Sequence, residues 1–151
     1  MAVIRGFVAL SLALAGTFAA ADDERAHVNY MLHCQGCHLP QAEGFAGRVP
    51  PMKDFVGYFL HSAEGRDFLI RVPGVAHSAL GDIEITELMN WLLQNFSADQ
   101  LPATFAPFTV DEVANLRQDP ESAPDAVRIE ILGRIAADLP TLADALAHQE
   151  Q

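Results

Sequence analysis

The pentapeptide Cys34-Gln35-Gly36-Cys37-His38 has the C-x-x-C-H pattern by which c-type haem is attached, and it is the strongest indication of the fold. Its two thiols can add across the haem vinyl groups, and two intervening residues let one helical turn present both sulfurs to the same porphyrin edge. The histidine follows the second cysteine directly, which predicts that His38 is the proximal ligand of the iron. These are the only two cysteines in the chain, so we expect one covalent haem and no disulfide.

Two other interpretations of this pentapeptide are weaker. A thioredoxin-like C-x-x-C should lie beside a βαβ pattern, and no strand-rich segment surrounds residues 34–38. A structural zinc site usually needs four ligands, and the sequence offers no second Cys or His pair. Five residues can also match by chance, so the surrounding sequence has to decide.

Residues 1–21 have the pattern of a secretory signal peptide. Arg5 precedes a largely apolar run over residues 7–15, and Ala19-Ala20-Ala21 offers a cleavage site after Ala21. The apolar run is short for a membrane anchor. Because haem is attached covalently outside the bacterial cytoplasm, export and the C-x-x-C-H motif predict each other, and we expect a periplasmic protein with no stable membrane span.

The sequence after Ala21 is strongly acidic. It holds 8 basic and 20 acidic residues, which gives a net charge of −12. Such a surface argues against nucleic acid and anionic membranes as partners, since their phosphates would repel it. It would allow a basic protein partner, although a solvated acidic surface is the simpler interpretation.

Hydrophobic spacing predicts an all-α fold. Helices are expected over about 22–33, 53–63, 66–72, 83–96, 109–118, 122–137 and from 140 onward, with a loop over 39–51 and a break at Pro73-Gly74. The clearest apolar face is that of residues 85–93, with Asp82 as the candidate N-cap. Thr109 and Glu112 have capping-box spacing, and Ser122 precedes Pro124 as a further N-cap candidate.

Residues 22–96 resemble the small monohaem class I cytochrome c family. A helix precedes the C-x-x-C-H motif, and Pro50-Pro51-Met52 resembles the family's P-x-L segment. Residues 80–85, L-G-D-I-E-I, are similar to the L-S-D-x-E-I that opens the last core helix, and Trp91 stands where the family carries an aromatic residue. The resemblance implies a cytochrome c-like helical fold around one haem, with residues 97–151 as a C-terminal helical extension outside it.

The resemblance also implies roles for single residues. The carbonyl of Pro50 would accept a hydrogen bond from the second nitrogen of His38 and so fix its tautomer. Met52 would pack on the haem, and Trp91 would help to close the pocket against the first helix. Each of these residues can equally serve as an ordinary core residue.

The segment over 72–80 departs from the family pattern. Class I cytochromes usually supply a methionine there as the sixth iron ligand, but this segment contains none, and His77 is its only good ligand. Three alternatives follow: His77 binds the iron, Met52 binds it, or the position is open. The choice affects function, because a thioether ligand raises the haem potential and an open position permits small-molecule chemistry.

Electron transfer is the leading hypothesis for function. No catalytic nucleophile or general base stands out in the sequence, so an enzyme is not expected. The expected partners are periplasmic redox proteins: a dehydrogenase as donor, and a cytochrome or oxidase as acceptor, in small transient contacts. The alternatives are a haem-based binder of small ligands, or a cytochrome subunit that residues 97–151 dock onto a periplasmic dehydrogenase.

Overall fold

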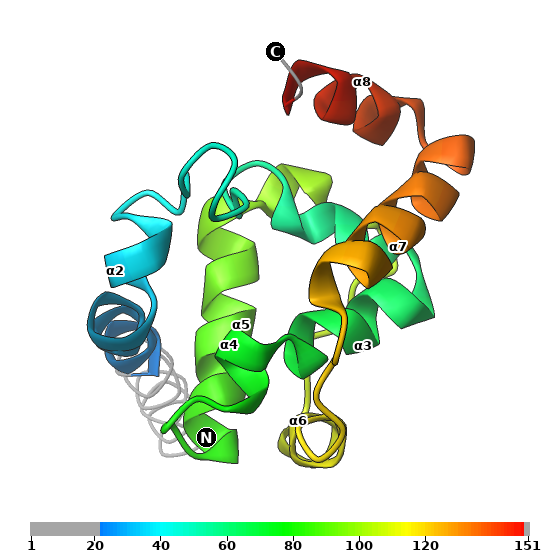
Figure 1. Ribbon diagram of the computed structural model, residues 1–151. Coiled ribbons are helices and arrows are strands. Elements are labelled where there is room, and N and C mark those ends of the chain that lie inside the picture. The colour runs from blue at the N-terminus through cyan, green and yellow to red at the C-terminus, as the bar shows by residue number, and fades with distance from the viewer. Residues whose placement is uncertain (1–21, 150–151) are drawn as a thin grey trace, which may run out of the picture.

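A computed structural model describes residues 22–149 of the 151-residue chain (Figure 1). The predicted signal peptide therefore lies outside the described residues. The first helix is described from residue 22 and ends at residue 33. It is followed by α2 (Gln35–His38), the 3-10 helix η1 (Val56–His61), α3 (Ala63–Arg71), α4 (Pro73–Ala76), α5 (Asp82–Phe96), the 3-10 helix η2 (Ala98–Gln100), α6 (Val110–Leu116), α7 (Pro124–Asp138) and α8 (Pro140–Gln149).

The all-α prediction is confirmed. Between residues 22 and 149 the structure contains no β-strand, and its one β-bridge joins Phe45 to Val49 within the predicted loop. Within the same range, no helix is both long enough and apolar enough to cross a bilayer.

Some helix ends differ from those predicted. The helix before Pro73-Gly74 does end there, at Arg71, but Pro73 then begins the short helix α4, because proline fits the first turn, where its missing N–H costs nothing. The N-cap of α5 is Gly81 rather than Asp82, and its N–H donates to the Glu84 carboxylate at 2.6 Å. Ala123, not Ser122, precedes α7. The capping box of Thr109 and Glu112 is confirmed.

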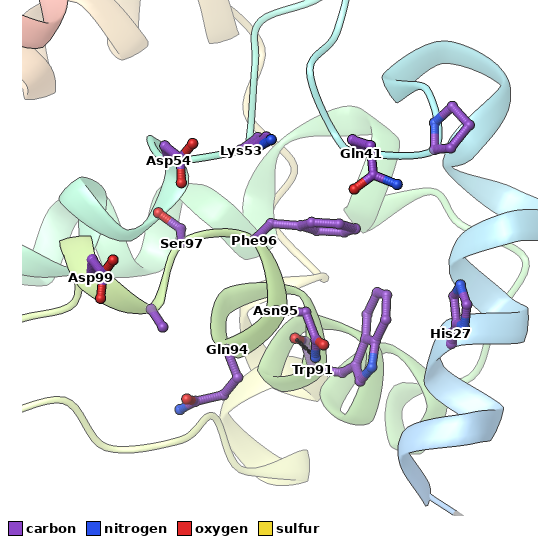
Figure 2. A pocket seen from close by; sticks show the side chains of 12 residues that line it. His27, Gln41, Lys53, Asp54, Trp91, Gln94, Asn95, Phe96, Ser97 and Asp99 are labelled. Atoms are coloured by element: carbon purple, nitrogen blue, oxygen red, sulfur yellow. Dashed lines mark hydrogen bonds between the residues drawn. The ribbon is translucent and has the colours of Figure 1, made fainter.

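The helix over 22–33 packs on α5 through a group of aromatic rings. Tyr30 is fully buried, and its ring lies 5.8 Å from that of Trp91 and 5.1 Å from that of Phe96, centroid to centroid. Trp91 also stacks on His27 of the first helix (Figure 2), and the centres of the two rings are 5.2 Å apart. These contacts fix the direction in which the first helix leads into the C-x-x-C-H turn.

Residues after Phe96 belong to the same hydrophobic core as the residues before it. The C-terminal segment adds six buried apolar side chains to the core: Phe108, Val113, Ile131, Leu132, Ile135 and Leu142. Helix α6 contacts α5 and α3, and α7 contacts α3 and η1. The predicted boundary at residue 96 therefore separates two stretches of sequence but does not divide the core.

Polar contacts also fasten the C-terminal segment to α3. Arg66 pairs with Glu112 at 2.5 Å, donates to the carbonyls of Ala106 and Pro107, and lies 4.1 Å from the centre of the Phe108 ring. Near the end of α3, Arg71 donates hydrogen bonds to both the carbonyl and the carboxylate of Asp119, which lies in the loop before α7. The segment is thus attached to the core at several separate points.

Candidate haem site

The C-x-x-C-H motif forms a tight helical turn at the end of the first helix. The N–H of Cys34 donates to the Tyr30 carbonyl at 2.9 Å, which continues the helix into the motif. The N–H groups of Cys37 and His38 then both donate to the Cys34 carbonyl, at 3.1 and 3.0 Å. As a result, the two cysteines and the histidine lie on one short turn, as the sequence predicted.

The loop after the motif folds back toward His38. Tyr30 donates its hydroxyl to the Leu39 carbonyl at 2.6 Å, and Gly44 donates its N–H to the His38 carbonyl at 3.1 Å. Gly44 has φ +65°, and a Cβ there would lie 2.4 Å from the Val49 carbonyl oxygen, so only glycine fits. This fold of the loop brings Pro50 beside the motif.

A cavity of about 370 Å³ opens beside the motif turn. Its wall is mostly apolar and is built from the motif, the Pro50–Met52 segment, η1, α3, α4, α5 and the start of α7. The lining residues are His33, Cys34, Cys37, His38, Pro50, Pro51, Met52, Val56, Phe59, Phe68, Leu69, Val72, Gly74, Val75, Ser78, Ile85, Leu88, Met89, Leu92, Pro124, Asp125 and Arg128.

The titratable groups of the motif are perturbed mainly by burial. Burial lowers the pKa of His38, and the backbone carbonyl of Pro50 opposes this by raising it. The His38 Nδ1 atom is buried and has no hydrogen-bond partner among the described residues. The Pro50 carbonyl is thus near enough to affect the pKa of His38, but the two groups do not form a complete hydrogen bond. Burial also raises the pKa of the Cys34 thiol, and Cys37 adds to that effect.

These observations fit a covalently attached haem. Both thiols are free, and they line the same apolar cavity as an imidazole whose buried nitrogen has no partner. Cys34, Cys37 and His38 would hold the group, while the apolar walls would cover a flat macrocycle and keep water from it. Across residues 22–149 there is no cluster of three or more His, Cys, Asp or Glu side chains that could hold a bare metal ion.

The other predicted site residues are placed differently from one another. Pro50 and Met52 line the cavity. Trp91 does not: it lines a separate surface pocket with His27 and Phe96 (Figure 2), so it supports the first helix rather than the cavity wall. His77 is exposed after α4 and is absent from the cavity lining. No observation here tests ligation of iron by His77, which would require this segment to turn inward.

Several residues of the cavity were not predicted from the sequence. His33 precedes the motif directly and could have been found from its position on the same helix. Pro124, Asp125 and Arg128 come from α7, about ninety residues after the motif. Nothing in the local sequence marks them, because only the packing of α7 on η1 and α3 brings them to the cavity.

The sequence is similar to two curated proteins named cytochrome c-552, both from Thermus thermophilus. One is 27% identical over 126 residues, which cover 72% of this chain and 84% of the relative. The other is 28% identical over 102 residues, covering 56% of this chain and 78% of the relative. No protein-family model matches the sequence. No solved structure matches it either.

This similarity supports a place in the cytochrome c family. It also reaches further than the resemblance over residues 22–96. Residues 1–96 make up less than 72% of the chain, so the first alignment must extend past Phe96. The C-terminal segment is therefore partly included in the similarity, in agreement with its contribution to the shared core.

Proposed function

We propose that this protein is a periplasmic electron carrier that holds one haem c through Cys34 and Cys37, with His38 as the proximal iron ligand. The observation that carries the proposal is the position of all three side chains on one turn at the wall of an apolar cavity. Similarity to proteins named cytochrome c-552 supports it. The bound haem would supply a one-electron couple between ferric and ferrous iron.

The protein's own residues would bind, shield and orient the group. Apolar side chains from α3, α4 and α5 lower the polarity around it, which is one of the means by which proteins set a haem potential. Cys37 and His33 are exposed beside the cavity, so one edge of the group would approach the surface there. An exposed edge of this kind suits electron exchange with periplasmic redox partners in brief, small contacts.

The test is to express the full chain, with its leader, in a host that has the c-type maturation machinery. The purified protein should keep the mass of one haem after denaturation, and it should be exported and cleaved after Ala21. It should also show a reversible one-electron couple in a redox titration. A full-length product without covalent haem under these conditions would overturn the proposal.

A second candidate function is the binding of a small ligand at an open sixth iron position. The segment that usually supplies the sixth ligand contributes Val72, Gly74, Val75 and Ser78 to the cavity, and its histidine, His77, lies outside. None of these four is a strong iron ligand. Carbon monoxide binding to the reduced protein would favour this function, while an unchanged spectrum under carbon monoxide would favour simple electron transfer.

A further inference from the structure

Arg128 is a charged residue in the cavity lining, and the haem site described above gives it no role. It belongs to α7, and its guanidinium carbon lies 5.1 Å from the centre of the Phe55 ring and 5.2 Å from that of Phe59. Both rings are buried. The side chain therefore extends from α7 into the apolar interior and not along the surface of the helix.

This guanidinium has no anionic partner in the described chain. Seven arginines lie between residues 22 and 149, and five of them pair with carboxylates: Arg25, Arg66, Arg71, Arg117 and Arg134. Of the remaining two, Arg48 is exposed, while Arg128 is half-buried and has neither an ion pair nor a hydrogen bond to residues 22–149. Asp125 lines the same cavity and acts on this charge, but it does not pair with Arg128 directly.

The electrostatics of Arg128 reflect this lack of a partner. Burial lowers the pKa of Arg128 to about 10, and Asp125, one turn earlier in α7, raises it only in part. The faces of Phe55 and Phe59 offset some of the cost, since the negative face of an aromatic ring attracts a cation. A buried charge is normally paired, so a binding anion is expected within reach of the guanidinium.

The haem that this cavity is proposed to hold carries two carboxylates of its own. Its propionates lie on the half of the porphyrin opposite the vinyl groups that the cysteines would bind. Figure 1 shows α2, with the motif, and α7 on opposite sides of α5. A group attached at Cys34 and Cys37 would therefore extend its propionate edge away from α2 and toward the walls that include α7.

We propose that Arg128 is the charge partner of a haem propionate, so that α7 completes the haem site from the C-terminal segment. The inference rests on the proposed function, because the anion arrives with the haem. Guanidinium groups form two parallel hydrogen bonds with a carboxylate, whereas they have no free lone pair with which to bind iron. Arg128 is thus a positioning residue that acts on the cofactor's charge.

The test compares Arg128→Gln with Arg134→Gln in the haem-loaded full chain. Both changes remove one positive charge from α7, but Arg134 is exposed and pairs with Glu64 and Glu130 at the surface. Arg128→Gln should lower the midpoint potential, because losing a nearby cation stabilises the ferric form, and it should shift the vibrational bands of the propionates. Arg134→Gln should change neither. Equal behaviour of the two variants would overturn the inference.

Arg128→Lys provides a second test if the glutamine variant fails to fold. Lysine keeps the charge but loses the planar fork, so the propionate bands should shift while the potential stays close to that of the wild type. Unshifted bands would overturn the inference. Failure of this inference is distinguishable from failure of the proposed function, since the latter is decided by whether the wild-type chain carries covalent haem at all.

Discussion

Arg117, in the C-terminal segment, donates a hydrogen bond to the carboxylate of Asp82, 2.6 Å away at the start of α5. The same guanidinium donates to the Ser78 carbonyl at 2.8 Å and lies 3.4 Å from the Ala76 carbonyl. The segment after Phe96 therefore holds in place the residues that come just before α5. Those residues include the stretch expected to supply the sixth iron ligand.

Replacing Arg117 with glutamine should lower the free energy of unfolding by about 1.5–3 kcal/mol, the range for hydrogen bonds to charged groups. The side chain is largely buried, so its three partners would lose a donor that water replaces poorly. Chemical denaturation followed by circular dichroism measures the change. Arg134→Gln is the control and should have a smaller effect, because its partners are exposed. Equal losses would show that Arg117 has no special role.

Truncating Leu132 to alanine should cost about 2–5 kcal/mol of stability, the usual range for a buried leucine. Leu132 is 3% exposed and belongs to the shared core, whereas Ile129 on the same helix is 72% exposed. Ile129→Ala should therefore change the free energy of unfolding by no more than about 0.5 kcal/mol. If both variants were as stable as the wild type, α7 would not be packed on the core in solution.

Glu112 should make stability depend on pH in the acidic range. The hydrogen bond from Arg66 is the main cause that lowers the pKa of Glu112 in the folded protein. A depressed carboxyl pKa contributes stability that is present above its ordinary value and is lost as the pH falls through the lower folded value. Glu112→Gln should remove this part of the acid dependence in urea titrations at several pH values. Asp111→Asn, an exposed neighbour in the same turn, should largely keep it.

His38→Ala should change the haem spectrum and the midpoint potential, because under the proposed function it would remove an iron ligand while both thioether links stay. Pro50→Ala should have a milder effect, since the change loosens only the residue that acts on the imidazole, where substitutions cost ~10–100-fold in affinity or activity. Optical spectra and redox titration measure both. An unchanged spectrum for His38→Ala would show that the proximal ligand has been assigned wrongly.

His77→Ala should leave the ferric spin state unchanged. The expectation follows from the exposed position of His77 and its absence from the cavity wall. Electron paramagnetic resonance of the oxidised protein would show a high-spin signal in both wild type and variant if the sixth position is open. A low-spin wild type that becomes high-spin in the variant would establish His77 as the ligand and show that its segment turns inward. Met52→Ala tests the remaining alternative in the same way.

The local features of this protein could be predicted from its sequence because each depends on neighbouring residues. The spacing of Cys34, Cys37 and His38 places them on one helical turn, and the structure has that turn. The apolar spacing over residues 85–93 predicted the buried face of α5. The Thr109 capping box predicted the start of α6.

What the sequence could not decide depends on contacts between residues far apart in the chain. Trp91 packs against the first helix, as the resemblance implied, but it does not line the cavity, and His77 is exposed. Their sequence positions were informative, but the direction of each side chain is set by packing.

The all-α class and the attachment motif were predictable because helix spacing and the C-x-x-C-H turn are encoded within a few residues. The position of α7 at the cavity, with Arg128 in the lining, depends instead on tertiary packing. That arrangement follows from burying Ile131, Leu132 and Ile135 in the common core, because Arg128 lies three, four and seven residues before them and so shares their face of α7. Helix spacing places Arg128 on the apolar face of α7, but the elements that this face covers are decided by hydrophobic burial between whole elements, which no local pattern shows.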